Sequence, residues 1–257
     1  MARTDFHTPR LCVGAPIADG ATVTLTSEQT NYLVNVLRLD EGARVLVFNG
    51  RDGEFAASLA RLSRKTAALV VGTQTRPQET PPDVDFLFAP LKHARLDYVA
   101  QKAVEMGARR LRPILTRRTQ VSRVNVGRLM ANAVEACEQC GVIWTPEVLA
   151  PEPLETILAQ WPAERLLVFC DEDAPQTSPL DALLAAPASG GVGLIIGPEG
   201  GFDERERAAI LAVPRVLRLS LGPRVLRADT AAVAALALIQ ATLGDWPRPG
   251  ARGLDAR

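Results

Sequence analysis

From residue 83 onward, short apolar segments alternate with longer segments whose apolar residues recur every three or four positions. The first kind is typical of buried strands and the second of amphipathic helices. Alternation of the two predicts an α/β domain, in which a parallel sheet carries helices on both faces. The segments expected to form strands are Val84–Phe88, Leu111–Leu115, Leu166–Cys170, Val192–Ile196 and Val216–Leu219.

The first part of the chain follows a different pattern. Short β-type segments are separated by Gly and Asp turns, which predicts a small β-barrel-like module. The polar, proline-rich segment TQTRPQETPPD at 73–83 separates the two patterns, so we place the domain boundary there. We expect one domain over 1–74 and a second over 83–246. The β-type segments lie at 21–26, 43–50, 53–62 and 66–72, with a helix expected at 27–39.

The composition is that of an ordinary folded protein, since 47% of the 257 residues are hydrophobic and 23% are charged. The N-terminus MARTDFHTPRL lacks the apolar core of a signal peptide. The most apolar segment, Thr230–Leu243, is too short and too rich in alanine to span a bilayer. We therefore expect a cytoplasmic protein without a membrane segment.

The formal net charge is zero, but the charges are segregated along the chain. Between Lys92 and Arg128, ten basic residues accompany two acidic ones. Between Leu129 and Ala185, ten acidic residues accompany a single arginine. A basic band of this kind is expected where a protein meets phosphates. Solvated helix faces, or pairing between the two bands, explain it equally well.

Cys137 and Cys140 form a C-x-x-C pair, a spacing found in zinc and redox sites. The surrounding segment NVGRLMANAVEACEQCG has helical spacing that predicts both thiols on its buried stripe. The sequence offers no second C-x-x-C or His pair to complete a metal site. We expect reduced core cysteines and no metal, and a zinc-dependent module remains an alternative.

Two turns follow predicted strands in the second region. GPEGG at 197–201 precedes Asp203 and Glu206, whose spacing predicts a capping box at the start of a helix. The second turn, in LSLGPRVLRADTAA, precedes another apolar helix. Ligands of α/β proteins bind at the carboxyl edge of the sheet, so the turns predict a ligand site, with a plain loop as the other interpretation. Neither a P-loop nor G-x-G-x-x-G is present, which disfavours a triphosphate or dinucleotide.

IIGPEGGFDERE, followed about twenty residues later by LSLGPRVLRADTA, resembles the paired signature of the bacterial 16S ribosomal RNA uracil-N3 methyltransferases of the SPOUT superfamily. KHARLDYVAQKAVEMGARRLRPILTRRTQV is similar to the first block of that family's catalytic domain, and EACEQCG to its Glu-Gln block. PRLCV and NVLRLDEGARVLVFNGRDGEF are similar to its N-terminal PUA-like domain. The resemblance covers nearly the whole chain to Leu243, in the family's order.

The resemblance implies a PUA-like RNA-binding β-barrel followed by a SPOUT domain whose parallel sheet contains a deep trefoil knot, a rare exception to the rule against knots. It also implies a homodimer, with active sites completed at the subunit interface, and S-adenosyl-L-methionine bound in a bent form in the knot. Glycine and proline there would allow backbone groups to approach the cofactor closely. The residues assigned to the cofactor site are Leu194, Ile196, Gly197, Pro198, Glu199, Gly200, Gly201, Leu219, Ser220, Leu221, Gly222 and Leu226.

The implied reaction is methylation of N3 of a specific uridine in 16S ribosomal RNA, with the assembled 30S subunit as the expected substrate. N3 must lose its proton to become a good nucleophile. Arg224 and Arg227 are candidates for orienting the base and stabilising its developing negative charge. Phosphate contact or a structural ion pair is the alternative role for these arginines. Asp229 would accept the proton or anchor an arginine, although the family more often has glutamate at this position.

RNA recognition would use the basic band and the first domain, and the target base must be unpaired or flipped. Glu138 and Gln139 would organise the site or the dimer, and Val142 stands where the family usually has arginine. Two other functions stay open: a SPOUT ribose 2′-O-methyltransferase, and a catalytically inactive RNA-binding or assembly protein. The candidate RNA contacts are Arg10, Arg38, Lys92, Lys102, Arg117 and Arg118.

Overall fold

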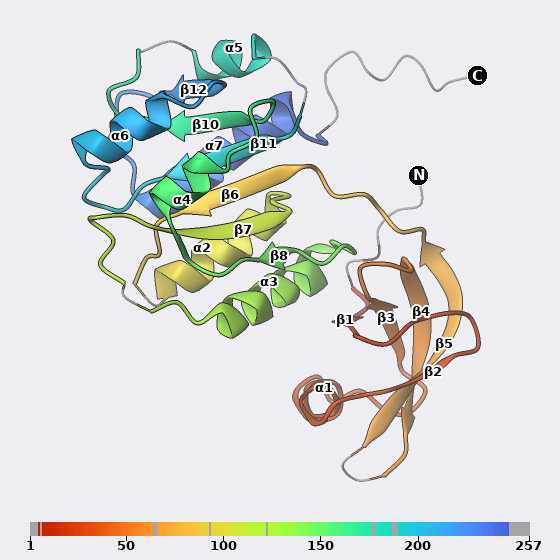
Figure 1. The fold of residues 1–257 in the computed structure, drawn as a ribbon. Coiled ribbons are helices and arrows are strands. Elements are labelled where there is room, and N and C mark those ends of the chain that lie inside the picture. The colour runs from red at the N-terminus through yellow and green to blue at the C-terminus, as the bar shows by residue number, and fades with distance from the viewer. Residues whose placement is uncertain are drawn as a thin grey trace, which may run out of the picture. The chain divides into compact units, whose positions relative to one another are not determined.

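The computed structural model describes residues 5, 7–63, 66–92, 94–121, 123–175, 178–186 and 190–246. Contacts divide the chain into two compact units. The first unit comprises Met1–Thr80 and Val134–Thr145, and the second comprises Pro81–Ala133 and Pro146–Arg257. The ribbon in Figure 1 shows the strands of the first unit in red to orange and the sheet of the second unit in yellow to blue.

The first unit is built on a five-stranded sheet in the order β1-β3-β4-β5-β2. β1 runs parallel to β3, and the other neighbouring strands are antiparallel. Helix α1 (Ser27–Asn31) begins at a capping box between Thr26 and Gln29 and continues directly into the π-helix η1 (Tyr32–Val36). The strands are β1 (Arg10–Cys12), β2 (Thr22–Thr24), β3 (Arg44–Phe48), β4 (Glu54–Arg61) and β5 (Ala67–Arg76).

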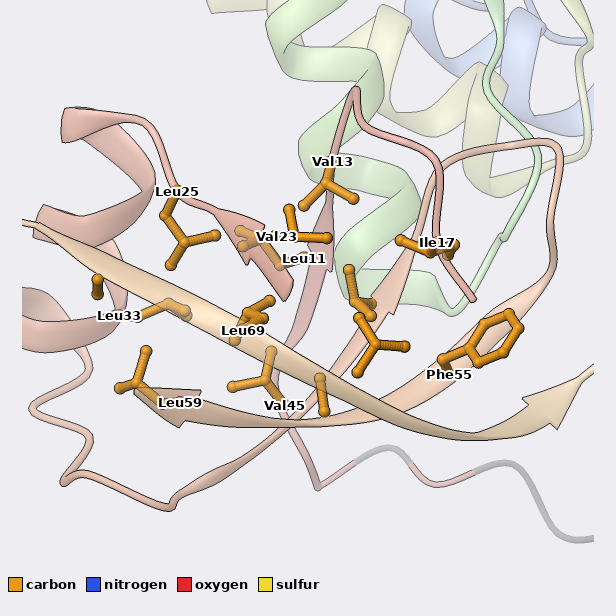
Figure 2. Close-up of a cluster of buried hydrophobic side chains, with 14 residues drawn as sticks. Leu11, Val13, Ile17, Val23, Leu25, Leu33, Val45, Phe55, Leu59 and Leu69 are labelled. Atoms are coloured by element: carbon orange, nitrogen blue, oxygen red, sulfur yellow. The ribbon is translucent and has the colours of Figure 1, made fainter. Parts of the chain in front are cut away.

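Alternating side chains of these strands meet in one apolar core (Figure 2). Val45 of β3 and Leu69 of β5 are fully buried there, and Leu33 of η1 is buried against them. Full burial of a valine or leucine side chain stabilises a fold by roughly 1.5–3 kcal/mol. The short β-type segments that predicted a small β domain therefore supply its core.

The second unit contains a parallel sheet in the order β12-β10-β11-β6-β7-β8, and β9 also pairs with β7. Four of the five predicted strands match residue for residue, and β7 begins one residue earlier than predicted. The two shortest strands were not predicted. The strands are β6 (Val84–Phe88), β7 (Arg110–Leu115), β8 (Glu147–Val148), β9 (Glu152–Pro153), β10 (Leu166–Cys170), β11 (Val192–Ile196) and β12 (Val216–Leu219).

Helices cover both faces of this sheet (Figure 1). α4 and α6 lie on one face, where they share a buried cluster with Leu87, Phe169 and Ile195, and α2 and α7 lie on the other. The predicted α/β architecture with a preceding small β domain is confirmed, whereas the trefoil knot stays a prediction. The helices are α2 (Ala94–Glu105), α3 (Val126–Cys140), α4 (Leu154–Ala159), α5 (Pro179–Leu184), α6 (Glu204–Leu211) and α7 (Ala228–Thr242).

The two cysteines of the C-x-x-C pair differ in exposure. Cys137 is buried, and burial raises the pKa of its thiol. Cys140 is exposed, so the prediction that both thiols are buried was wrong for this residue. The reason is that α3 ends at Cys140 and the chain turns at Gly141, where φ is +70°. Within the described residues, no group of three or more His, Cys, Asp or Glu is placed to hold a metal ion.

None of the helices in the described part of the chain is both long and apolar enough to cross a membrane.

Candidate active site

The two predicted turns start at the same edge of the parallel sheet. The first turn (residues 197–201) follows β11, the second turn (residues 220–227) follows β12, and β10 lies between these strands. Directly after β10, the buried Asp171 accepts hydrogen bonds from Arg207 of α6 at 2.8 Å and Arg218 of β12 at 2.7 Å. This pairing, which sequence reasoning missed, ties the end of β10 to the elements that carry both turns.

The glycines of the first turn are required for different reasons. At Gly201 φ is +70°, a conformation that residues with a Cβ rarely adopt. At Gly197 a Cβ would come within 2.8 Å of the Phe202 ring, so this glycine makes room for a side chain of the protein itself. Gly201 N donates to Pro198 O at 2.8 Å and closes the turn.

The predicted capping box is present immediately after the first turn. Asp203 Oδ1 accepts from Glu206 N at 2.8 Å, and Glu206 Oε2 accepts from Asp203 N at 3.0 Å. Glu206 is only 3% exposed, and its Oε1 accepts from Arg117 N at 2.7 Å. Arg118 Nη1 donates to Gly200 O at 2.5 Å. Two residues predicted to contact RNA therefore lie against the first turn.

The second turn has fewer contacts of its own. Gly222, with φ of +95°, donates its N–H to Ser220 Oγ at 3.4 Å. Arg227 precedes α7 and makes no side-chain capping hydrogen bond. Arg224 and Arg227 are exposed, and the Val225 side chain between them is 89% exposed. The candidate catalytic arginines are thus presented on an open segment.

Arg95 lies between the first turn and the start of α7. Its Nη1 is 3.6 Å from Glu199 Oε1, and its Nε is 4.0 Å from Asp229 Oδ2. Asp229 Oδ1 also accepts from Thr230 N at 2.8 Å. One arginine from α2 thus brings together an exposed cofactor-site candidate and the candidate proton acceptor. Arg95 was not predicted as a site residue, although it belongs to the block KHARLDYV.

The remaining cofactor candidates line the ends of the two strands. Leu194 and Ile196 are buried in β11, and Leu219 is buried in β12. Leu221 and Leu226 of the second turn are half-buried. Partly exposed apolar surface is thus available at the second turn, from Leu221 and Leu226.

The structure separates the candidate RNA contacts by exposure. Arg38 and Lys92 are exposed, and Arg38 has φ of +54°. Lys102 is half-buried, lies 2.7 Å from Glu105 Oε1 and sits over the Tyr98 ring.

Arg10 requires a correction, because it is 5% exposed and bonds to Glu54 Oε2 at 2.9 Å. A buried, paired guanidinium holds the fold together and does not offer itself to RNA. The predicted RNA contact at Arg10 is therefore wrong.

Glu138 and Gln139 lie near the end of α3, in the part that belongs to the first unit. Glu138 Oε1 accepts from Cys12 N in β1 at 2.9 Å, whereas Gln139 is exposed. Burial raises the pKa of Glu138 to about 7. Glu138 therefore attaches the end of α3 to the sheet of the first unit.

Two protein-family models match the chain: an RNA methyltransferase domain over residues 78–240 and an RNA methyltransferase PUA domain over residues 25–72. The ribosomal RNA small subunit methyltransferase E of a Synechocystis species is 34% identical over 240 residues, which cover 91% of this chain and 78% of that protein. The chain belongs to this RNA methyltransferase family. The resemblance seen in the paired turn motifs is confirmed.

Other members of the family align with this chain over almost their full length. The protein of the same name from Rickettsia conorii is 25% identical over 232 residues, covering 90% of this chain and 94% of its own. The crystal structure of a ribosomal RNA small subunit methyltransferase E from Neisseria gonorrhoeae, bound to S-adenosyl methionine, is 27% identical with a TM-score of 0.82. That alignment covers 94% of this chain and 100% of the Neisseria chain. Both the sequence relatives and the solved structure therefore match the chain across its two units.

Proposed function

We propose that this RNA methyltransferase transfers a methyl group from S-adenosyl-L-methionine to N3 of a specific uridine in 16S ribosomal RNA, giving 3-methyluridine. The observation that carries the proposal is the pair of strand-end turns at one sheet edge, in a chain whose relatives are named small-subunit ribosomal RNA methyltransferases. The cofactor proposal is supported by the Neisseria relative, which was crystallised with S-adenosyl methionine.

The residues at the two turns fit this cofactor. At Gly201 and Gly222, no atom of the described residues other than the flanking ones lies within 4 Å of where a Cβ would be, so this side of the backbone faces open space. Half-buried Leu221 and Leu226 provide apolar contact surface for a nucleoside. When bound, S-adenosyl-L-methionine supplies a methyl group on a sulfonium. We assign the backbone of 197–201 and 220–222, with Leu194, Ile196, Leu219 and Leu226, to holding it.

The charged residues beside the turns supply what the uracil needs. Arg224 and Arg227 are proposed to orient the base and to stabilise the negative charge that develops on its oxygens. Asp229 is proposed to accept the N3 proton, and Arg95, 4.0 Å away, orients its carboxylate. Positioning of the base and removal of its proton are thus assigned to separate side chains.

The larger assembly follows from the same proposal. Residues 1–74 would form a PUA-like RNA-binding domain, residues 83–246 would form the methyltransferase domain with its trefoil knot, and two chains would form a homodimer. The assembled 30S subunit is the proposed substrate. The exposed arginines and Val225 of the second turn support this view, because an open segment next to the cofactor site can be completed by RNA or by a second copy. Arg38, Lys92, Lys102, Arg117 and Arg118 are the proposed RNA contacts, with Gln139 at the dimer or the site.

The test is methyl transfer from labelled S-adenosyl-L-methionine to small ribosomal subunits that lack the modification, followed by nucleoside analysis. We expect 3-methyluridine at one site, and much less of it on free 16S RNA. Label on a ribose hydroxyl would overturn the base assignment in favour of a 2′-O-methyltransferase. Cofactor binding without any labelled nucleoside would overturn the proposed substrate. Analytical ultracentrifugation of the same preparation tests the homodimer.

A further inference from the structure

Another small turn, separate from the first and second turns, lies beside the first turn. It spans residues 116–119, directly after β7, and is closed by its own hydrogen bonds. Thr116 N donates to Thr119 Oγ1 at 2.9 Å, and Thr119 N donates to Thr116 O at 3.1 Å. Arg117 and Arg118 form its tip. Local hydrogen bonds therefore close the backbone turn that carries these two arginines.

Three contacts join the 116–119 turn to the first turn and its helix. Arg117 N donates to Glu206 Oε1 at 2.7 Å, and Arg117 Nε lies 3.2 Å from Asp203 Oδ2. Arg118 Nη1 donates to the carbonyl of Gly200 at 2.5 Å. The Arg118 Cδ lies 3.4 Å from the Cβ position of Gly200, so the side chain follows the turn closely.

Glu206 takes part in one of these contacts and in the capping box that follows the first turn. A capping box uses one carboxylate oxygen of its glutamate, and here Oε2 accepts from Asp203 N. The other oxygen accepts from the backbone of Arg117, 89 residues away in sequence. The side chain is 3% exposed, so neither bond is readily replaced by water. Glu206 therefore does more than begin α6.

The tip of the 116–119 turn also faces solvent. Arg117 and Arg118 line an open depression of about 300 Å³ together with Asp203, Glu204 and Arg205. A guanidinium carries five N–H donors, so one bond from Arg118 to a carbonyl leaves others for a phosphate. The same side chain can thus contact the proposed cofactor turn and an RNA backbone at once.

We propose that Glu206 is a positioning residue that couples cofactor binding to RNA binding by holding the 116–119 turn against the 197–201 turn. This inference rests on the proposed function of 197–201 as part of the cofactor site. Because Glu206 bonds to the backbone of Arg117 in one turn and of Asp203 next to the other, a ligand that favours the bound arrangement of one turn also favours that of the other, so each ligand strengthens the other. The coupling must be reciprocal, with the same factor in both directions.

The experiment measures that factor by calorimetry. S-adenosylhomocysteine, which cannot be turned over, is titrated into the full chain with and without unmodified small ribosomal subunits. We expect RNA to tighten its binding in the wild type. In Glu206→Gln, one bond from a buried charged group is lost, so affinity without RNA falls by about tenfold and the coupling factor approaches one. The matched control Glu155→Gln removes the same charge from an exposed position in the first turn of α4 and keeps the wild-type coupling.

A second variant decides the matter if Glu206→Gln fails to fold. Arg118→Gln changes an exposed side chain and is expected to weaken S-adenosylhomocysteine binding about threefold without any RNA present. If Arg118 contacts only RNA, Arg118→Gln will leave the affinity for S-adenosylhomocysteine unchanged. That result would overturn the proposed coupling. So would a wild-type coupling factor of one.

The proposed function fails separately, by absence of cofactor binding or of methyl transfer in the wild type. Wild-type methylation combined with unaltered coupling in Glu206→Gln leaves the function standing and removes the role of Glu206.

Discussion

The two turns at the carboxyl edge of the sheet differ in how firmly the protein holds them. The first turn is closed by Gly201, followed by a complete capping box and contacted by Arg118. The second turn has one hydrogen bond of 3.4 Å at Gly222 and ends at α7 without a side-chain cap. The first turn is therefore preorganised, and such a surface binds a ligand without a further ordering cost.

The difference assigns the two turns different tasks. The firmly held turn offers backbone and glycines, which suits a cofactor. The open turn carries Arg224 and Arg227, which are proposed to act on the base. Chemistry demands precise positioning of reacting groups, so the second turn must gain its final form from what binds there. Beyond the second turn, Arg95 Nε lies 4.0 Å from Asp229 Oδ2 at the start of α7.

The largest expected effect concerns Arg227, because it sits on the open turn. In Arg227→Gln, methyl transfer to the small subunit should fall by about 10²–10³, the usual loss for one oxyanion-stabilising donor. Cofactor affinity should change less than about twofold, which calorimetry checks. The control Arg109→Gln removes an exposed charge just before β7, at the opposite edge of the sheet from both turns, and should retain near-normal rates. Parallel loss of rate and cofactor affinity would instead show that Arg227 holds the turn.

A smaller effect is expected when one glycine of each turn is replaced by alanine, and the two turns should respond differently. Gly201→Ala and Gly222→Ala each force a side chain into a positive-φ conformation, a strain of about 2 kcal/mol. The first turn is held and cannot relax, so Gly201→Ala should lower the melting temperature by roughly 4–8 °C. The second turn can relax, so Gly222→Ala should lower cofactor affinity about tenfold with a much smaller thermal shift. Equal thermal shifts in the two variants would refute the contrast.

The fold was largely predictable because its strongest signals are local. Buried parallel strands form continuous apolar segments, so β6, β10, β11 and β12 were predicted with their observed ends. β8 and β9 have two residues each, and no periodicity can be read from two residues. Their pairing with β7 depends on the sheet and not on their own sequence.

The site was predictable only where its contacts are close in sequence. The capping box of Asp203 and Glu206 spans three residues and was predicted correctly. The bond from Arg118 to Gly200 joins positions 82 residues apart, and no spacing rule reveals it. Arg10 was misassigned for the same reason, since a sequence shows its charge but not its buried partner Glu54.

The contrast between firmly held and open segments extends to the first unit, where Glu138 is held by its hydrogen bond from Cys12 N. Its pKa rises from 4.5 to about 7, chiefly through burial, with the N–H of Cys12 acting in the opposite direction and Glu135 adding to the rise. The unfolded chain releases this proton near pH 4.5 and the folded chain near pH 7. The folded state thus binds more protons in between, so stability falls as pH rises from 4.5 to 7 and is level above that.

Glu138→Gln tests this pH dependence. The amide oxygen of the glutamine can still accept from Cys12 N, but the glutamine does not titrate. The variant should therefore not decline in stability between pH 4.5 and pH 7. At pH 8 it should be more stable than the wild type by about 1–2 kcal/mol, less than a fully buried group would give. At pH 4.5 the two should agree closely in urea unfolding. The control Glu135→Gln, at an exposed position that faces Glu138, should show only a small change. A wild type with equal stability at pH 5 and pH 8 would contradict the prediction.

The smallest effect is expected at Arg38, an exposed residue of the first unit. Its φ of +54° is the only positive value at a non-glycine position in the described residues, and it costs the fold about 1 kcal/mol. Arg38→Gly should therefore raise the free energy of unfolding by up to about 1 kcal/mol, partly offset by the entropy of glycine. If Arg38 contacts RNA, the same variant should weaken binding to the 16S transcript severalfold and reduce its salt dependence. Arg38→Asn tolerates the same backbone and removes the charge, so it separates the two effects: weaker RNA binding without added stability keeps the contact, and unchanged binding in both variants removes it.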